Sequence, residues 1–286
     1  MTGPKEKPEG GLYFISTPIG AARDITLRAL DLLAMADVIA AEDTRSMRHL
    51  MEIHGVPLGD RPLWAYHDHN GERVRPNILA ALSDGKSVVY ASEAGTPLVA
   101  DPGFQLGRAV IAAGHKVIAA PGPSAMLAAL TVSGLPSDRF LFAGFAPSGK
   151  AARRQWLADL STASATVILY ESPKRLKALL TELGETFGIV RQAAICRELT
   201  KRFEEISRGT LAELALVYAD RTVKGEIVVV IDRAPPRSAD PADVNAALKE
   251  ALECHSTKDA ATLVAETFGL PRRQIYQIAL KLAAEN

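Results

Sequence analysis

The chain of 286 residues is long enough for two domains, and a composition of 48% hydrophobic and 23% charged residues is ordinary for a protein that folds by burying apolar surface. Because 33 basic residues balance 33 acidic ones, net charge points to no polyanionic partner, and any nucleic-acid surface has to be a local patch. No apolar run approaches the roughly 18 residues that cross a membrane, and the start lacks an apolar signal core. With Cys196 and Cys254 far apart, the sequence predicts a cytoplasmic protein with reduced thiols and a flexible tail over residues 1–10.

The first half alternates short apolar runs with helical patterns, which predicts an α/β fold whose mainly parallel sheet is covered on both faces. Strands are expected at 12–16, 38–41, 62–66, 88–91, 116–120 and 139–145. Helices are expected at 26–36, around 47–55, around 78–82, at 104–113 and at 124–133. A change of composition at 147–149 places the domain boundary there, so the first domain is expected over 11–147.

The second half restarts the alternation, but its short connections favour hairpins and hence a mixed sheet over 148–233. Helices are expected at 150–160, 176–183 and 211–218, and strands at 166–170, 192–197, 203–207 and 226–231. A Pro-rich linker over 234–241 then leads into a small helical module over 242–286. Its helices are expected at 242–253, at 256–268 and after the turn at 269–271.

Two turns rich in Gly and Pro follow neighbouring strands of the first half. The loop after the strand at 88–91 contains Gly95, Pro97 and Pro102, and the turn at 121–125 offers small residues and free amides. The first loop alone is as well explained by a plain structural turn. Because ligands of α/β sheets lie at the carboxyl ends of strands, the two turns together predict a ligand site.

Other motifs are weaker. No G-x-G-x-x-G follows a strand, so the usual dinucleotide-binding fold has no support. The segment at 144–150 matches G-x-x-x-x-G-K, but Ala151 replaces the hydroxyl that holds magnesium and Pro147 lacks an amide proton, which leaves a P-loop NTPase a remote alternative. His67 and His69 give only a weak zinc signal.

Charged residues admit two interpretations in three places. Glu42, Asp43 and Arg45 are equally compatible with a plain helix N-terminus, where acids favour the dipole. The basic residues at 153–154 and 174–177 are more typical of a solvated helix face than of a phosphate clamp. The tail has a helix-turn-helix pattern with Arg272 and Arg273 at the start of its second helix, yet from residue 235 onward six basic residues face seven acidic ones, so packing or dimerisation remains as plausible as nucleic-acid binding.

Taken together, eight motifs resemble those of the tetrapyrrole methylase superfamily, in the branch that methylates ribosomal RNA. They cover nearly the whole chain in order: LYFISTPIG (12–20), AEDTR (41–45), YHDHN (66–70), SEAGTP (92–97), PGPSA (121–125), YESP (170–173), RELTK (197–201) and KGE (224–226). Glu93 stands where the family usually has Asp, and Lys174 where a His is common, so the roles of these two positions are open.

The resemblance implies two α/β domains with S-adenosylmethionine (SAM) in the cleft between them, usually in a homodimer. It implies methylation of the ribose 2′-hydroxyl of a cytidine in the decoding region of small-subunit (16S) rRNA. By motif position it implies the following cofactor-binding residues: Pro18, Gly95, Thr96, Val99, Ser124 and Ala125 from the first domain, and Tyr170, Gly225, Glu226 and Ile227 from the second.

This chemistry needs no metal, because a sulfonium already carries an activated methyl group and the main task is to hold the acceptor oxygen in line behind it. A 2′-hydroxyl is a poor nucleophile, so a carboxylate or His must take its proton, and Asp43, His69 and Glu93 are the candidates. Arg45, Arg197 and Lys201, with Arg272 and Arg273 in the tail, are expected to contact the RNA. A small-molecule corrin methylase, which would not need the tail, and a non-catalytic RNA-binding module remain alternatives.

Overall fold

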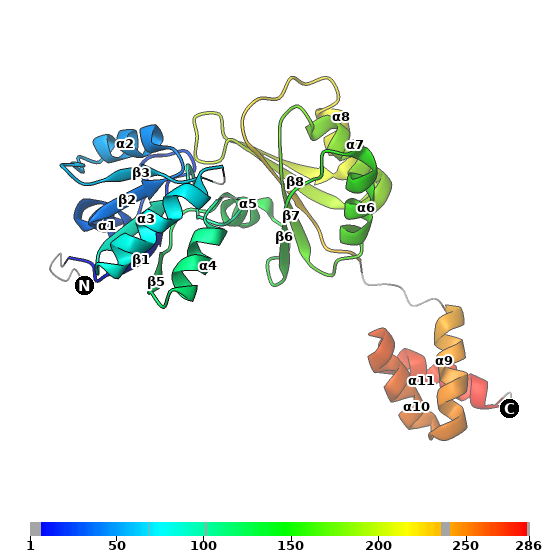
Figure 1. The fold of residues 1–286 in the computed structure, drawn as a ribbon. Helices are drawn as coiled ribbons and strands as arrows, with labels where there is room; N and C mark the ends of the chain where they lie inside the picture. Colours follow the sequence, from blue (N-terminus) through cyan, green and yellow to red (C-terminus); the bar gives the residue numbers. More distant parts are fainter. Residues whose placement is uncertain (1–6, 68, 101, 236–240, 285–286) are drawn as a thin grey trace. The chain divides into compact units, whose positions relative to one another are not determined.

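The computed structural model describes residues 7–67, 69–100, 102–235 and 241–284, and the chain divides into a large unit, residues 1–234, and a small helical unit, residues 235–286 (Figure 1). The expected tail at 1–10 and linker at 234–241 lie partly outside the described residues. The described part of the tail is held to the body, since Lys7 pairs with Asp37 at 2.7 Å and Lys116 with Glu9 at 2.6 Å.

The first half of the large unit is built on a five-stranded parallel sheet in the order β3-β2-β4-β1-β5, as the alternating pattern predicted. Its strands are β1 (Gly11–Ile15), β2 (Val38–Ala41), β3 (Leu63–Ala65), β4 (Ser87–Ala91) and β5 (Val117–Ala120). Its helices are α1 (Leu27–Met35), α2 (Thr44–Ile53), α3 (Gly71–Ser83) and α4 (Phe104–Ala112). Successive residues of β1 enter different cores: Tyr13 packs with Leu33 and Met51, whereas Leu12 packs with Ile78 and Leu106. Helices therefore cover both faces, and β4, buried along its whole length, lies at the centre.

The second half is built on a mixed sheet in the order β6-β7-β10-β8-β9, in which β6 and β7 form the one parallel pair of neighbouring strands. Its strands are β6 (Phe140–Phe145), β7 (Thr166–Glu171), β8 (Gln192–Arg197), β9 (Glu205–Thr210) and β10 (Ile227–Ile231). Its helices are α6 (Lys150–Ser161), α7 (Leu176–Phe187) and α8 (Leu211–Val217). The mixed sheet is confirmed.

Strand β6 lies in a different sheet from the one expected. The sequence grouped 139–145 with the first domain, but Phe140 is in register with Thr166 of β7. The transition between the two sheets thus lies before Phe140 rather than at 147–149. An apolar run specifies a strand without specifying its partner, and the composition change at 147–149 marks the turn from β6 into α6.

Helix α5 (Ala125–Ser133) connects the two halves, because it follows the last strand of the first sheet but packs on the second (Figure 1). Its residues Ala129 and Leu130 share a core with Ile168 of β7, Cys196 of β8 and Val228 of β10. Nearly every residue of this helix is apolar, which is the pattern of a helix buried on several sides.

The helical unit consists of α9 (Pro241–Cys254), α10 (Thr257–Phe268) and α11 (Arg272–Ala284), as expected. The Ser256 side chain accepts a hydrogen bond from the Asp259 amide and begins α10. Gly269, in the left-handed conformation at φ 63°, ends it. Val244, Val264 and Ile275 contribute one residue from each helix to the unit's own core.

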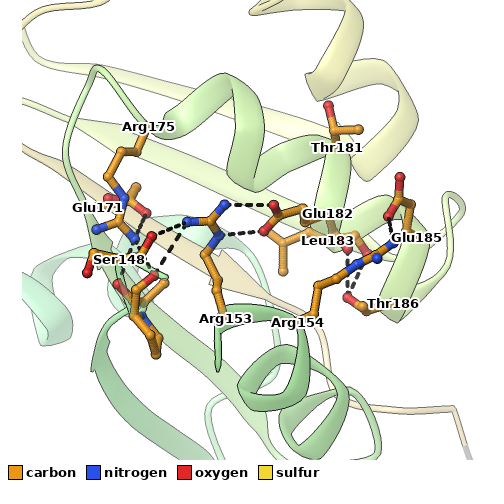
Figure 2. Close-up of polar contacts among 12 residues, drawn as sticks. Ser148, Arg153, Arg154, Glu171, Arg175, Thr181, Glu182, Leu183, Glu185 and Thr186 are labelled. Atoms are coloured by element: carbon orange, nitrogen blue, oxygen red, sulfur yellow. Dashed lines mark hydrogen bonds and ion pairs between the residues drawn. The ribbon is translucent and has the colours of Figure 1, made fainter. Parts of the chain in front are cut away.

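On the outer face of the second sheet, α6 and α7 are joined by two ion pairs of different burial (Figure 2). Arg153 contacts both oxygens of Glu182, at 2.5 and 2.7 Å, and each side chain is only about a tenth exposed. Arg154 pairs with Glu185 at 3.2 Å, and these side chains are more than half exposed. Arg153 also donates to the Ser148 carbonyl at 3.3 Å, so the buried pair holds the turn before α6.

A third arginine ties this turn to the end of β7 (Figure 2). Arg175 donates to the carbonyls of Ala146 and Pro147, at 2.6 and 3.1 Å, and lies 3.2 Å from a carboxylate oxygen of Glu171, whose side chain is almost fully buried. These contacts hold the segment between β7 and α7 against the turn that precedes α6.

We expect Arg153→Met to lower the free energy of unfolding of the large unit by about 2–3 kcal/mol, because Glu182 is left as a buried carboxylate without its partner. The matched change Arg154→Met should cost about 0.5 kcal/mol or less, since an exposed pair contributes little. Urea unfolding followed by circular dichroism measures both. Adding Glu182→Leu to Arg153→Met should recover part of the loss, and equal losses for the two single variants would contradict the role given to burial.

Candidate active site

A cavity of about 370 Å³ lies between the two halves of the large unit, a volume typical of small-molecule sites. Its walls come from the strand ends and loops of both halves. All expected cofactor residues except Pro18 line it: Gly95, Thr96, Val99, Ser124, Ala125, Tyr170, Gly225, Glu226 and Ile227.

Hydrogen bonds join the two turns that the sequence placed at one crevice. The Thr96 hydroxyl donates to the carbonyl of Pro123 at 2.8 Å and lies 3.1 Å from the hydroxyl of Ser16. Gly95, at φ 79°, exchanges two backbone hydrogen bonds with Thr17, at 2.9 and 3.1 Å. The loops after β1, β4 and β5 therefore form one connected wall.

The N-terminus of α5 forms part of this wall, because Ser124 and Ala125 line the main cavity. Ser124 is the N-cap residue, but its side chain makes no capping hydrogen bond, and its buried hydroxyl has no hydrogen-bond partner. The first amides of a helix have no partner within the helix, and the helix dipole makes this end positive. The wall can thus accept an anionic group of a ligand.

Two segments of the cavity wall hold residues in the left-handed backbone region, which non-glycine residues seldom occupy. Leu98 and Ala100, at φ 70° and 61°, flank Val99, and Glu198 and Thr200, at φ 51° and 64°, flank Leu199. The flanked residues Val99 and Leu199 both line the cavity. Such conformations cost free energy and persist where surrounding contacts impose them, commonly at functional sites.

The loop after β1 docks directly on the second half beside the cavity. The amide of Ala21 donates to the Thr200 hydroxyl at 3.0 Å. At Gly20, a Cβ atom would lie 2.5 Å from Cγ of Lys201, 2.6 Å from the Thr200 hydroxyl and 3.0 Å from the Leu199 carbonyl. Position 20 therefore has no room for a side chain. Glycine at this position lets the loop after β1 contact the turn at 198–201.

A second hollow of about 220 Å³ lies on the other side of the same loops and contains two of the three candidate bases. Asp43 and Glu93 line it together with Pro18 and Ser92. In the turn after β1, Pro18 thus lines this hollow and its neighbour Ile19 lines the main cavity, which separates Pro18 from the other expected cofactor residues.

Asp43 is fully engaged in local hydrogen bonds. It is the N-cap of α2 and accepts from the amides of Arg45 and Ser46, at 2.7 and 3.3 Å, and from the Arg45 guanidinium at 2.8 Å. The Arg45 side chain, followed by these amide bonds, lowers the pKa of Asp43 to about 2. Of the two interpretations offered for the charged residues at 42–45, Asp43 therefore fits that of a helix N-terminus. His69 lines neither hollow, and its ring lies 6.0 Å from that of His67.

The expected RNA-contacting cations of the large unit already have acidic partners. Arg45 is highly exposed but pairs with Asp43. Arg197, mostly buried, pairs with Glu205 at 3.0 Å. In the helical unit, Arg272 and Arg273 begin α11, and both residues are exposed.

Lys201 is the third of these cations, and it lies between two carboxylates. Its ammonium group is 3.1 Å from Glu198 and 3.0 Å from Glu226. These carboxylates hold the pKa of Lys201 above its ordinary value although burial opposes this.

The sequence missed several residues of the main cavity. Ile19, Phe145, Ser172, Cys196 and Leu199 line it as well. Leu199 lies inside the RELTK motif at 197–201, where the charged residues were the expected site residues, and Cys196 precedes that motif in β8. Burial raises the pKa of Cys196 to about 11, so its thiol is neutral and acts as part of an apolar wall.

Other site types find no support in the described parts of the chain. No group of three or more His, Cys, Asp or Glu side chains there is placed to hold a metal ion. Gly144 of the P-loop-like segment lies at a bulge within β6, so a strand occupies the start of that segment. No described helix is long and apolar enough to span a bilayer.

Comparison with known proteins gives matches along nearly the whole chain. The family model for Tetrapyrrole (Corrin/Porphyrin) Methylases matches residues 11–215, and the model for the RsmI C-terminal HTH domain matches residues 238–283. A Mesorhizobium japonicum protein named ribosomal RNA small subunit methyltransferase I is 46% identical over 99% of this chain and 97% of its own. Proteins of the same name from Mycobacterium tuberculosis and Escherichia coli O157:H7 are 42% and 39% identical, each over 96% of both chains.

Solved structures with a similar fold are more distant in sequence. Cobalt precorrin-4 methyltransferase, a cobalamin biosynthetic enzyme, aligns with a TM-score of 0.59 and 19% identity over 77% of this chain and 94% of its own. The methyltransferase CobJ aligns with a TM-score of 0.60 and 20% identity over 81% and 98%. At this level of identity the likeness establishes the fold.

We expect Gly20→Ala to lower the free energy of unfolding by about 1–3 kcal/mol, because its Cβ would overlap atoms of the 198–201 turn. In Gly184→Ala, on α7, the new Cβ would meet only Ile189, at an ordinary 3.6 Å, and a helix interior favours alanine. That control should be neutral or slightly more stable than the unchanged protein in urea unfolding. Equal stability of the two variants would show that the loop after β1 does not dock as described.

Proposed function

The chain belongs to the tetrapyrrole methylase family, and on this premise we propose that it is a SAM-dependent enzyme that methylates the ribose 2′-hydroxyl of a cytidine in small-subunit (16S) rRNA. The observation that carries the proposal is the similarity, over almost the full length of both chains, to proteins named ribosomal RNA small subunit methyltransferase I. It includes the helical unit, which matches a model of its own.

The residues of the main cavity fit SAM as cofactor. The first amides of α5, which the Ser124 side chain does not cap, suit the carboxylate of its methionine tail, and the buried Ser124 hydroxyl offers a further polar group beside them. Val99, Tyr170 and Ile227 supply apolar wall for an aromatic base. When bound, the cofactor supplies a methyl group already activated by its sulfonium.

The chain's own task is then to position the acceptor hydroxyl and to take up its proton. Correct placement of the oxygen gives the larger part of the rate, because the methyl group needs no further activation. Asp43 is a poor proton acceptor, since its pKa of about 2 lies far from neutral pH. Its bonds to Arg45 suit it better to holding that cation near the RNA backbone, which leaves His69 and Glu93 as the stronger candidates.

The helical unit is the part that distinguishes an RNA substrate from a small tetrapyrrole. Arg272 and Arg273 begin its last helix, where helix-turn-helix proteins contact nucleic acid. We place the enzyme in the cytoplasm, acting as a homodimer on small-subunit rRNA or on the assembled small subunit of the ribosome.

Incubation with labelled SAM tests the proposal. Small ribosomal subunits, naked rRNA and a corrin precursor are offered separately, and the label is then mapped. We expect label on the 2′-oxygen of one cytidine of the small-subunit rRNA and none on the corrin. Label on the corrin alone would identify a small-molecule methylase, and RNA binding without transfer would identify a non-catalytic module.

Single replacement of Asp43, His69 and Glu93 by Ala tests the catalytic scheme. We expect loss of His69 or Glu93 to lower kcat about 100-fold or more if that residue is the base, with SAM binding retained, because a general base contributes roughly that factor. Asp43→Ala should chiefly weaken rRNA binding and cost about 1 kcal/mol of stability through the lost N-cap. Methylation that survives all three replacements would refute the scheme.

A further inference from the structure

Glu198 lies at the junction of two segments of the cavity wall, the turn at 198–201 and the turn at 224–226. Its Oε1 accepts from the amide of Glu226 at 2.9 Å and from the ammonium group of Lys201 at 3.1 Å. Its backbone amide donates to the Glu226 carbonyl at 2.9 Å. One residue thus connects both turns through its side chain and its backbone.

The backbone around this carboxylate is shaped to admit it. Glu198 itself is left-handed, at φ 51°, and Gly225 has φ 91°. A Cβ atom at position 225 would lie 2.4 Å from Cδ and Cγ of Glu198. Glycine is therefore required at position 225 for two reasons. It adopts a backbone conformation that other residues avoid, and it has no side chain to block the Glu198 carboxylate.

Both turns reach the main cavity, whereas Glu198 does not line it. Leu199 follows Glu198 directly, and Gly225 and Glu226 form the adjoining part of the wall. We propose that Glu198 is a positioning residue for cofactor binding, which holds these two turns in the geometry that receives SAM. This inference rests on the proposed function, because it takes SAM as the ligand of the cavity.

The effect of losing this carboxylate follows from its partners. Without it the Glu226 amide loses its acceptor and Lys201 loses one of its two carboxylates, so the backbone hydrogen bond between positions 198 and 226 has to hold the two turns with less support. The hydrogen bond from the Glu226 amide and the nearby Lys201 hold the pKa of Glu198 below its ordinary range, so the group is ionised at neutral pH. We therefore expect replacement of Glu198 to weaken SAM binding and to leave the rate of methyl transfer nearly unchanged, because Glu198 does not line the cavity.

Three variants of the full-length protein test this role: Glu198→Ala, Glu198→Gln and, as the matched control, Glu185→Ala. Glu185 is an exposed carboxylate paired with Arg154 on the outer helices and lines neither hollow. Isothermal titration with SAM gives Kd, methyl transfer to small subunits gives KM and kcat, and thermal unfolding without ligand checks the fold.

For Glu198→Ala we expect about a tenfold rise in Kd and in KM for SAM, which corresponds to about 1.4 kcal/mol, with kcat within about twofold of the unchanged enzyme. Glu198→Gln keeps an oxygen acceptor for the Glu226 amide without the charge, so its rise should be smaller, about threefold. Glu185→Ala should bind SAM normally.

Normal SAM affinity in Glu198→Ala, or a fall in kcat at unchanged KM, would overturn the inference while leaving the proposed function intact. If Glu198→Ala does not fold, normal affinity in Glu198→Gln overturns it in the same way. Failure of the unchanged protein to bind SAM would instead overturn the proposed function.

Discussion

The packing of α5 sets how the two halves of the large unit lie against each other. This helix starts at the end of β5 in the parallel sheet, yet its Ala129 and Leu130 are buried against the mixed sheet. Most residues of this helix are apolar, so its packing on the mixed sheet removes apolar surface from water and stabilises the fold, although Leu127 on another side stays 45% exposed. The core that it shares with the second sheet therefore fixes the two halves against each other and leaves its free N-terminus beside the cavity between them.

Two glycines allow loops of the cavity wall to approach each other closely. Gly20 lets the loop after β1 reach the 198–201 turn, and Gly225 lets the Glu198 carboxylate reach the 224–226 turn. Left-handed residues occur in the same wall, at Leu98, Ala100 and Thr200 among others. Strain of this kind is retained where many contacts impose one conformation. The cavity is thus shaped by the backbone, which explains why so many of its lining residues are small or apolar.

Much of this fold follows from sequence periodicity. Periodicity does not predict which sheet a strand joins or which side of a turn a residue faces. Alternation and helical spacing predicted the strands and helices of both sheets, and the Gly- and Pro-rich turns after the strands at 88–91 and 116–120 predicted two of the loops that meet. The sheet to which β6 belongs could not be predicted, since Phe140 and its neighbours would suit either sheet. Pro18 and Ile19 lie on different sides of one turn, a distinction that side-chain type does not reveal. Glu198 was missed because its role depends on a turn 28 residues later along the chain.

The three cations of the large unit that are proposed to contact RNA already have partners within the chain. Arg45, Arg197 and Lys201 are each neutralised by acids of the same chain. An RNA phosphate bound at one of these cations would have to compete with its acidic partner, and that competition would be easiest where the acid is exposed, as for Glu226 beside Lys201. Because Glu226 also lines the cofactor cavity, a phosphate that displaced its carboxylate from Lys201 would act on the cofactor wall as well. Substrate and cofactor sites would then share one residue, with the Glu198 carboxylate holding its backbone in place.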